Sequence, residues 1–440
     1  MTAELELEKF TDVVVSYVDD DGYPMSYSTT ARKQNGKLVL EKPTYLKPKK
    51  QMTVLLNHIT PLPTGGYTDR RYLMMKGEAE ILQDRVVFTP RKSYGWDEKT
   101  KPFFQYCEEN VPQAKSYLRK LSESVGREVK ARLPTLQLLF RATRFPFLSA
   151  TAAPVLIGVG SAAYLGYFDF LLFILTIVGA SLIHLGLNTA NDYFDSKLGA
   201  DEKNIQPTPF SGGSRIIQYG LLTSRQVATM SALFYAVALV IGLYLAFTRG
   251  LIPILTLMAL GVFISYAYTA PPFKLAYRGV GEIAVGVGFG PVIVLGSHFV
   301  QTQQFTAEAV LASIPIGIFI ALILFINEIP DSPYDAAAGK RTLVTRLNKA
   351  QVLNIYKILL GIAYALIVAS VLLQLAPPTV LIALITIPRA VKAVKLVDQT
   401  YGNPYLMIPA LASNIQVATF TGFLHAAGFF AWAVIQLFAR

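Results

Sequence analysis

Cysteine is almost absent from this chain of 440 residues, because Cys107 is the single one. One cysteine cannot form an internal disulfide, so a disulfide-built fold is excluded. Residues 1–8 (MTAELELE) also lack the basic stretch and apolar core of a secretory signal. We therefore expect the soluble part of the chain to stay in the cytoplasm.

Charged residues are scarce as well, at 16% against 52% hydrophobic residues, and they are unevenly distributed. Residues 1–144 are charged and resemble a soluble domain, whereas long apolar runs dominate from residue 145 onward. The net charge of +11 does not indicate nucleic acid, since the Lys and Arg beyond residue 144 lie mainly between apolar runs. This pattern is typical of membrane topology, and we expect a lipid bilayer and no nucleic acid as partner.

A membrane-spanning helix needs about 20 mostly apolar residues. The second part of the chain offers about nine such stretches, which predicts an all-α polytopic membrane bundle. The eighth is the weakest, because Pro388, Arg389, Lys392 and Lys395 crowd its end. The predicted spans are 145–166, 169–190, 226–247, 251–269, 282–300, 308–327, 351–374, 379–396 and 411–438.

Connector charge predicts the orientation of these spans in a multi-pass cell-membrane protein. Basic residues gather before the first span and after the even-numbered spans, and connectors after odd-numbered spans hold almost none, Arg249 excepted. By the positive-inside rule the N-terminal domain and the charged connectors are cytoplasmic, and nine spans place the C-terminus, with Arg440, outside. Residues 126–144 form a basic linker between a soluble domain, 1–125, and the membrane domain, 145–440.

The soluble part carries two hairpin signals. Asp21-Gly22 separates two β-rich runs, and Asn35-Gly36 separates two more; both dipeptides are typical of tight β-turns. Further strands are expected at 53–56, 71–82 and 85–88, followed by a helix over 111–125. Many short strands at close spacing predict a small β-barrel.

Two stretches, VVVSYVDDDGYPMSYS (13–28) and RRYLMMKGEAEI (70–81), resemble the pyridoxamine-phosphate-oxidase-like split barrel. The resemblance covers roughly residues 8–125. It implies a flavin bound at a dimer interface, and so an oligomer formed through the N-terminal barrel. The compact basic candidates for a flavin phosphate are Lys49, Lys50, Arg70 and Arg71, for which a role as solvated surface charges is the alternative.

Two acidic segments lie at the ends of otherwise apolar helices, at residues 188–201 and 327–335. Burying a carboxylate at membrane depth costs free energy, so a carboxylate found there usually belongs to a functional site. Spacings of three and four residues place them on one helical face. Carboxylate and amide oxygens suit Mg2+, which also takes phosphate oxygens from substrates. Two such segments facing each other predict two Mg2+ ions that hold a diphosphate; helix capping is the alternative role for these residues.

Four motifs in order resemble the UbiA superfamily of intramembrane prenyltransferases, and among its branches the menaquinone-type enzymes. They are NTANDYFDSKLGAD, SGGSR, YTAPPFKLAYRGVGE and NEIPDSPYDAAAGKRTLVTRL. The resemblance covers roughly residues 135–440. It implies nine helices around a central cavity, and transfer of a polyprenyl group from an isoprenyl diphosphate to an aromatic acceptor, 1,4-dihydroxy-2-naphthoate in menaquinone biosynthesis.

The residues divide into three predicted roles. Those assigned to catalysis are Asp192, Asp195, Asp331, Asp335 and Lys274. Those assigned to the diphosphate are Asn188, Arg215, Arg278, Lys340 and Arg341, since Arg grips phosphate bidentately and Lys acts as a point charge. Those assigned to the metal are Asn188, Asp192, Asp195, Asn327, Asp331 and Asp335, with Asp201 a looser candidate.

Departures from the family pattern concern mainly the acceptor. Gly199 and Gly339 stand where many members carry a third Asp, as in the menaquinone-type pattern. Tyr268 and Lys274 are six residues apart instead of four, and Glu328 also differs from some menaquinone-type sequences. The spacing of Tyr268 and Lys274 leaves open which residue takes the role of the family's lysine, and Glu328 leaves the acceptor open without affecting the reaction class.

Ionisation of an allylic diphosphate would be assisted by the metal and the basic residues, and the allylic cation would be sheltered by aromatic faces. Other interpretations stay open. One is transfer to another quinone precursor or a lipid alcohol, a second is cyclisation of the prenyl diphosphate, and a third is a transporter. The aromatic candidates are Tyr193, Tyr266, Tyr268 and Phe273, and the glycine-rich stretch 281–290 is expected to thin the wall beside a long prenyl chain.

Overall fold

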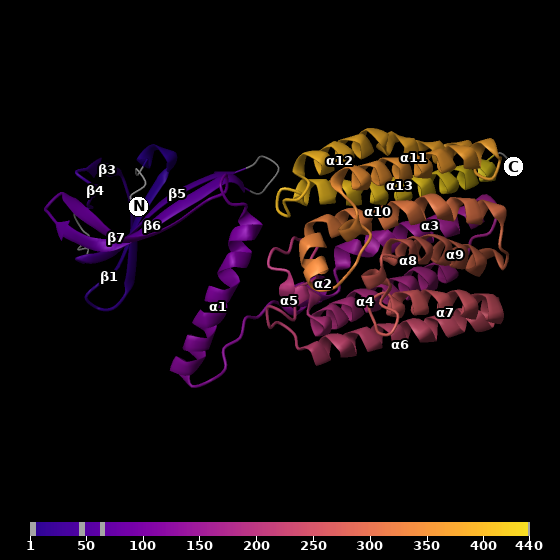
Figure 1. The fold of residues 1–440 in the computed structure, drawn as a ribbon, viewed down its shortest axis with the longest axis horizontal. Helices are drawn as coiled ribbons and strands as arrows, with labels where there is room; N and C mark the ends of the chain where they lie inside the picture. The colour runs from indigo at the N-terminus through magenta and orange to yellow at the C-terminus, as the bar shows by residue number, and fades with distance from the viewer. Residues whose placement is uncertain (1–5, 44–48, 62–66, 439–440) are drawn as a thin grey trace. The chain divides into compact units, whose positions relative to one another are not determined.

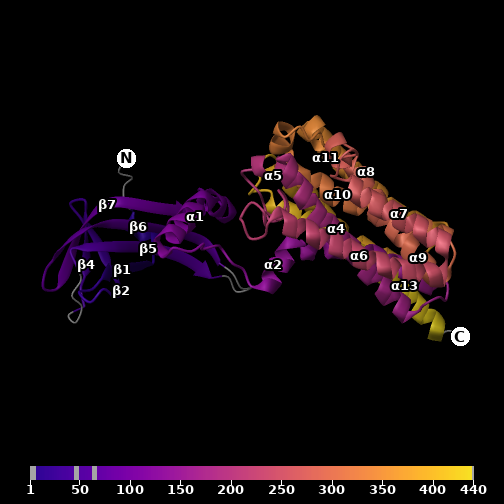
Figure 2. The same ribbon diagram turned by 90° about the horizontal axis from the view of Figure 1, so that it is seen from below.

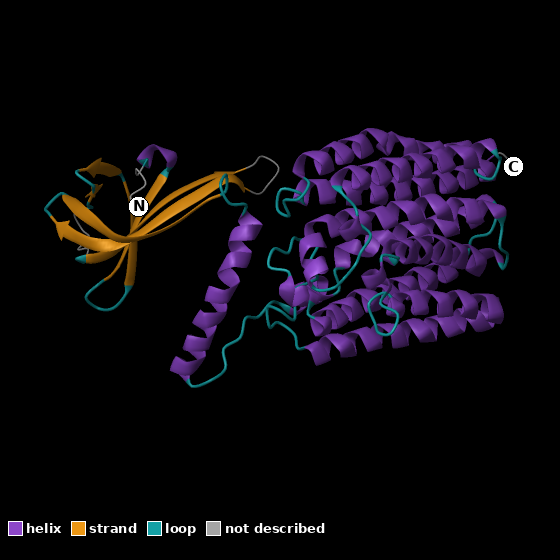
Figure 3. Ribbon diagram, in the orientation of Figure 1, coloured by secondary structure: helices purple, strands orange, loops and turns teal. Residues whose placement is uncertain are grey.

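The structure is a computed structural model that describes residues 6–43, 49–61 and 67–438. It divides into two compact units between Asn110 and Val111, one built from a sheet and the other from helices (Figures 1 and 3). The predicted boundary at residue 125 is the last residue of the connecting helix α1, Phe103–Val125. Residues 1–5 and 440, on which the signal and topology expectations partly rest, lie outside the described residues.

The first unit is one seven-stranded sheet in which every pairing is antiparallel. The strand order is β2-β1-β5-β6-β7-β4-β3. The strands are β1 Asp12–Val18, β2 Pro24–Thr29, β3 Ala31–Gln34, β4 Lys37–Glu41, β5 Gln51–Pro61, β6 Tyr67–Ile81 and β7 Arg85–Asp97.

Both predicted hairpins are present. The Asp-Gly turn joins β1 to β2, and the Asn-Gly turn joins β3 to β4. Asn35 and Gly36 both have positive φ, 48° and 76°, as a two-residue turn with the right-handed twist of the strands requires. The residue types in these turns therefore determine the register of the two strand pairs, β1 with β2 and β3 with β4.

The sheet curls into a half-barrel around an apolar core. Val15, Leu40, Val54 and Phe88 are fully buried on its inner face. Thr29 Oγ1, on edge strand β2, donates to the carbonyl of Glu41 on β4 at 2.7 Å, so the two ends of the sheet approach each other. The expectation of a split-barrel-like domain is confirmed to the extent that an antiparallel half-barrel sheet is present.

Three of the four basic residues considered for a flavin phosphate, Lys49, Arg70 and Arg71, have partners of their own. Arg70 is ion-paired with Glu98 and stacks on Phe103 at 4.1 Å. Arg71 pairs with the carboxylate of Asp69, and Lys49 with Asp20. Nothing among the described residues supports the flavin, and both the flavin and the oligomer stay predictions.

The second unit is entirely helical, and seven of its helices are long and apolar enough to cross a membrane (Figure 3). The main helices are α2 Thr135–Ala142, α3 Ser149–Tyr164, α4 Phe170–Leu198, α5 Ala200–Lys203, α6 Ser224–Arg249, α7 Leu251–Ala267, α8 Gly281–Val287, α9 Ile293–Thr302, α10 Ala307–Ala337, α11 Lys349–Leu372, α12 Ile387–Thr400 and α13 Ile408–Phe438. The spans that begin at 145 and 281 also include the short helices η2 Phe145–Leu148 and η4 Gly288–Val292.

The predicted bundle is confirmed, and two of the nine predicted spans differ from long apolar helices. The fourth corresponds to α7, which has 17 residues and is short for a crossing. The eighth, 379–396, is broken between a 3-10 helix, Pro378–Thr386, and α12. Pro388 lies at the start of α12, where it cannot donate to the preceding turn, and the exposed Arg389, Lys392 and Lys395 make α12 amphipathic.

Helix starts follow recognisable caps. Thr223 and Gln226 form a reciprocal capping box at α6, and Asn348 and Gln351 form another at α11. Asp169 caps α4 through the backbone N–H of Leu172. These polar residues interrupt the apolar runs and so set where the long helices begin.

Helix α10 runs through the core of this unit, with Ile316, Phe319 and Ile326 almost fully buried. Small residues let α8 and η4 approach α10 closely, because a Cβ on Gly290 would lie 2.7 Å from the Cα of Gly317. Helices α4 and α6 run side by side in both views (Figures 1 and 2). The carboxyl ends of α4 and α10 carry the two acidic segments.

Candidate active site

The two acidic segments face one cavity of about 180 Å³. It lies at the carboxyl ends of α4 and α10 and is also lined by residues 210–213 of the connector 204–215. The sequence predicted that the segments could share a site, and the helical unit brings them to the same cavity. The site-forming polar residues that line it are Arg144, His184, Asn188, Asn191, Asp195, Asp201, Ser211, Asn327, Glu328, Asp331, Asp335 and Lys340.

The carboxylates of the first segment are held by charged and hydroxyl partners. Asp192 is 2% exposed and forms an ion pair with Arg144. Asp195 accepts a hydrogen bond from the hydroxyl of Tyr277 at 2.7 Å and another from the amide of Asn191 at 3.1 Å. The partners come from outside α4 as well as from the preceding turn of α4, so the tertiary fold fixes these side chains.

In the second segment Asp331 is held by neutral donors. The amide of Asn204 donates to one oxygen and the backbone N–H of Gly212 to the other, each at 2.9 Å. Gly212 and Gly213 both have φ of 76°, and a Cβ on Gly213 would lie 2.8 Å from the carboxylate of Asp201. Glycine at these positions lets the connector backbone approach the acids closely.

Lys340 joins the two segments. Its Nζ lies 3.9 Å from Oδ2 of Asp195 and 3.5 Å from Oδ2 of Asp335. Burial alone would lower the pKa of Lys340, but these two carboxylates outweigh it and raise the pKa well above the ordinary value. The side chain therefore stays charged, as the predicted diphosphate-binding role requires.

The other predicted cations lie around the site without lining the cavity. Arg215 donates to the backbone carbonyl of Asp201, and Arg278 to that of Pro272 at 2.9 Å. Lys274 lies over the ring of Tyr277 at 5.7 Å. Arg341, whose backbone N–H donates to Tyr277, is exposed. Asp192 also lies behind the cavity lining, paired with Arg144.

Several site residues were missed by the sequence reasoning, among them Arg144, His184, Asn204 and Tyr277. Arg144 was interpreted only as a topology signal, yet it adopts a left-handed backbone, φ 50°, and contacts Asn191 and Asp192. The role of a basic residue immediately before the first span is ambiguous in the sequence, since it can serve as a topology signal or as part of a catalytic site. Asn204 and Tyr277 belong to the connectors, where the spacing of residues in the sequence does not indicate which way a side chain points.

The oxygen atoms of the site are of the chemical type that binds a magnesium ion. Buried site oxygens without a hydrogen-bond partner belong to Asp192, Asp201, Asn327, Glu328 and Asp335, of which the Asp335 oxygen has only the ion pair with Lys340 at 3.5 Å. An unpaired buried oxygen is costly unless it binds something. Burial, followed by the carboxylates of Asp195 and Asp192, raises the pKa of Asp201, which shows how dense the negative charge is. Oxygen-only donors are the ligands that Mg2+ prefers.

The protein's own cations separate these acids from one another. Lys340 lies between Asp195 and Asp335, and Arg144 occupies one oxygen of Asp192. Among residues 6–43, 49–61 and 67–438, no three His, Cys, Asp or Glu side chains cluster as ligands of one ion. The acidic charge of the site is thus partly offset by one lysine and one arginine.

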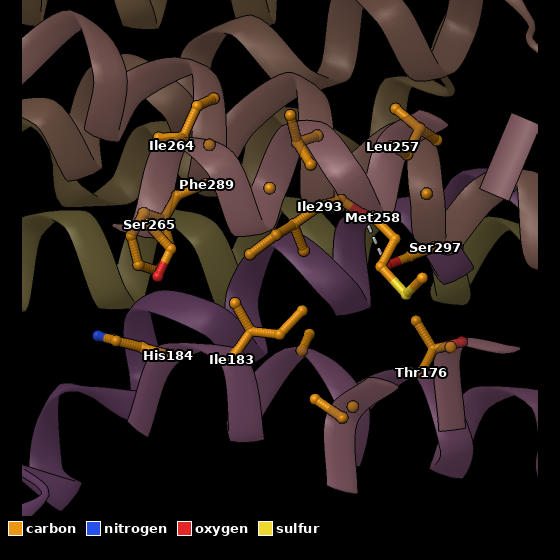
Figure 4. Close-up of a pocket in the computed structure, with 18 of the residues that line it drawn as sticks. Thr176, Ile183, His184, Leu257, Met258, Ile264, Ser265, Phe289, Ile293 and Ser297 are labelled. Carbon is orange, nitrogen blue, oxygen red and sulfur yellow. Dashed lines mark hydrogen bonds between the residues drawn. The ribbon is translucent and has the colours of Figure 1, made fainter. Parts of the chain in front are cut away.

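A second, apolar cavity of about 160 Å³ continues from the first between α4, α6, α7, α8, η4 and α9 (Figure 4). Leu257, Met258 and Ile293 are among its walls. Of the glycines in the stretch 281–290, Gly288 lines this cavity, while Gly290 packs on α10 instead. The residues shared by both cavities are His184, Leu187, Tyr268, Val285 and Phe289.

Of the four aromatics predicted to shelter a cation, Tyr268 lines both cavities. Tyr193 lies under the ammonium of Lys197 instead, at 5.3 Å. Tyr266 and Phe273 are 47% and 42% exposed. The spacing of these residues in the sequence did not distinguish Tyr268 from the rest.

A bundle of apolar helices with acids and a lysine around one cavity defines a class of membrane enzyme that handles a diphosphate on a long apolar chain. Residues 151–405 match the UbiA prenyltransferase family. The chain therefore belongs to this family and is a multi-pass membrane prenyltransferase.

Several curated relatives extend this match. The 1,4-dihydroxy-2-naphthoate octaprenyltransferase of Bacillus subtilis is 30% identical over 293 residues, 66% of this chain and 92% of the relative. The enzyme of the same name from Mycobacterium tuberculosis is 32% identical over 262 residues, 59% of this chain and 85% of the relative. The 2-carboxy-1,4-naphthoquinone phytyltransferase of Synechocystis is 28% identical over 304 residues, 68% and 94% of the two chains.

Solved structures of the family are more distant. A UbiA homolog from Archaeoglobus fulgidus, bound to GPP and Mg2+, is 15% identical, with a TM-score of 0.48, over 68% of this chain and 98% of the other.

Proposed function

We propose that this prenyltransferase moves a polyprenyl group from an isoprenyl diphosphate to 1,4-dihydroxy-2-naphthoate, with Mg2+ as cofactor. The observation that carries the proposal is the polar cavity with two acidic segments, joined through shared walls to an apolar cavity. The relatives named above act on naphthoate or naphthoquinone carboxylic acids, which supports this class of acceptor over a lipid alcohol.

The polar cavity is the proposed diphosphate site. Magnesium would be held by the oxygens of the six predicted residues: Asn188, Asp192, Asp195, Asn327, Asp331 and Asp335. When bound, Mg2+ neutralises negative charge on the departing pyrophosphate. The protein contributes Lys340 and Arg144, whose positive charges lie beside the acids and stabilise the same oxygens.

The apolar cavity is the proposed site of the prenyl chain. Its wall of aliphatic side chains offers no charge and few hydrogen-bonding groups, so it favours hydrocarbon over water. Glycines at 179, 242, 261, 288 and 296 widen it where larger side chains would protrude. A chain entering here places its first carbon at the shared wall, next to the acids.

At that wall the reaction exchanges one bond for another. The bond between the allylic carbon and the diphosphate oxygen breaks, and its electron pair leaves with the pyrophosphate. A ring carbon of the acceptor supplies the electrons of the new carbon–carbon bond. The ring then regains aromaticity when that carbon loses a proton or, if it bears the carboxylate, CO2, and the bonding electrons return to the ring. Tyr268 offers its π face to the developing cation at this position.

Three connectors meet around the polar cavity. Lys203 donates to the carbonyl of Ala337 at 3.0 Å, and the backbone N–H of Arg341 donates to that of Tyr277 at 3.1 Å. The connectors after α4, α7 and α10 therefore share one side of the helical unit. Their basic residues support a cytoplasmic site and N-terminal domain, and a C-terminus outside.

The proposal is tested with purified protein, radiolabelled isoprenyl diphosphate and 1,4-dihydroxy-2-naphthoate, with and without Mg2+. We expect a prenylated naphthalene product that forms with Mg2+ and disappears in excess chelator. Cyclisation would give a labelled hydrocarbon without any acceptor, and a transporter would leave both compounds unchanged. Either of these results, or transfer that ignores chelation, would overturn the proposal.

A further inference from the structure

The wall between the two cavities locates the reacting carbon, if the proposed function holds. The diphosphate belongs in the polar cavity and the prenyl chain in the apolar cavity. The carbon that joins them must then lie beside the residues that line both. Of these described residues, two carry hydrogen-bonding side chains, His184 and Tyr268.

His184 is held in a defined orientation. It belongs to α4, one turn before Asn188, and is 7% exposed. Its Nδ1 lies 2.7 Å from the hydroxyl of Thr151 on α3, and the ring of Phe289 packs on it edge-to-face at 4.8 Å. In Figure 4 His184 lies at one end of the apolar cavity, on the side of Ser265 and Phe289.

The contact with Thr151 favours one tautomer of the His184 ring. Thr151 is fully buried, and His184 Nδ1 is its hydroxyl's hydrogen-bond partner. A buried hydroxyl donates where it can, so Nδ1 accepts and the neutral ring carries its proton on Nε2. Among the residues that the structure describes, none hydrogen-bonds to Nε2, which leaves a donor for a ligand in the cavity.

The surroundings of this donor suit an aromatic ring with oxygen substituents. Leu187, Val285 and Phe289 supply apolar walls at the same place. The diphosphate has other partners, because Lys340 lies among the acids of the polar cavity. We propose that His184 Nε2–H donates a hydrogen bond to an oxygen on the acceptor ring and so positions that ring against the allylic carbon. His184 is thus a positioning residue that exchanges no proton.

The test measures KM for each substrate separately in variants of this pair. His184→Leu keeps most of the volume and removes the donor, so KM for the naphthoate should rise about tenfold, the effect of one lost hydrogen bond. KM for the isoprenyl diphosphate should stay within about twofold, since no contact to it is lost. His184→Gln retains an amide donor and should restore most of the acceptor affinity. Thr151→Val removes the hydroxyl that favours one tautomer of the His184 ring, so KM for the naphthoate should rise less than in His184→Leu.

An acceptor analogue sharpens the assignment. 1-Hydroxy-2-naphthoate and its 4-hydroxy isomer each lack one ring oxygen. For the analogue that lacks the oxygen bound by His184, wild type and His184→Leu should have equal KM. A merely structural role would leave the two proteins different for every acceptor.

Several results would overturn the inference. One is an increase in KM for the isoprenyl diphosphate, which would assign Nε2 to the leaving group. Others are an unchanged acceptor KM in His184→Leu, or equal losses in the Leu and Gln variants. If His184→Leu fails to insert, calorimetric titration of naphthoate into Thr151→Val and His184→Gln gives the same comparison. A wild type that transfers no prenyl group would contradict the proposed function instead.

Discussion

The two acidic segments look alike in the sequence, but the fold holds them in different ways. In the first, Asp192 pairs with the guanidinium of Arg144. In the second, Asp331 is held by the amide of Asn204 and the backbone of Gly212. One carboxylate is thus balanced by a full positive charge and the other by neutral donors.

We expect this difference to separate two tasks at the site. If Mg2+ or a diphosphate binds, the guanidinium that pairs with the first carboxylate is free to pair with a phosphate oxygen instead. An amide-held carboxylate keeps its geometry and depends on the connector 204–215 remaining in place. Lys340 couples the two segments, since its ammonium lies between Asp195 and Asp335.

The largest expected effect comes from removing an acid from either segment. Asp192→Ala and Asp331→Ala should each lower transfer by ~10²–10³, the usual loss of an electrostatic stabiliser at a reacting centre. The measurement is labelled prenyl transfer per amount of inserted protein. Asp398→Ala, which breaks an exposed pair with Lys349, is the matched control and should stay active. Near wild-type transfer in either site variant would contradict the two-segment site.

The coupling between the segments is tested by comparing two lysines. Lys340→Ala should reduce transfer by ~10² and raise KM for the diphosphate, because its charge contacts both acids. Lys274→Ala should have a much smaller effect, since that side chain lies over Tyr277 and lines neither cavity. Equal losses of transfer activity in the two variants would support the catalytic role that the sequence predicted for Lys274.

A smaller effect is expected from the connector that holds the second segment. Gly212→Ala combines positive φ with a Cβ only 2.8 Å from Asn204, so strain of ~1–3 kcal/mol should displace the backbone N–H from Asp331. The Mg2+ concentration for half-maximal transfer should rise. Gly220→Ala has similar strain, φ 71°, with nothing within 4 Å of the new Cβ, and controls for strain alone. An identical response of both variants would show that the amide contact is unimportant.

The smallest effect is expected from removing the N-terminal domain, because every residue of both segments lies in the helical unit. A chain that begins at Lys130 keeps Arg141 and Arg144, so its positive-inside signal should persist. We expect it to retain transfer when the yield of inserted protein is taken into account. A correctly inserted truncation that binds Mg2+ and isoprenyl diphosphate but transfers nothing would give the sheet domain a share in catalysis.

Much of the architecture was predictable because it follows local patterns. Hydrophobic run length located seven long helices, and Asp-Gly and Asn-Gly turns located two hairpins. The eighth span was the weakest in the sequence because of Pro388 and the cations that follow it, but the break into a 3-10 helix and α12 was not predicted. Helix spacing likewise indicated which acids share a face.

The partners of those acids were not predictable, because they come from connectors whose path depends on the whole fold. Asn204 and Gly212 reach Asp331 from more than a hundred residues away in the chain. Arg144 carried the same sequence signal as any cytoplasmic cation. Of the cations assigned to the diphosphate from the sequence, Lys340 lines the cavity, whereas Arg215 and Arg278 donate to backbone carbonyls.

The most direct test of the account is product analysis with the purified full chain, Mg2+, labelled isoprenyl diphosphate and 1,4-dihydroxy-2-naphthoate, run beside Asp331→Ala. The account predicts a prenylated naphthalene product from wild type that is lost with chelator and nearly lost in the variant. Equal product from both proteins, or no product from a correctly inserted wild type, would contradict it.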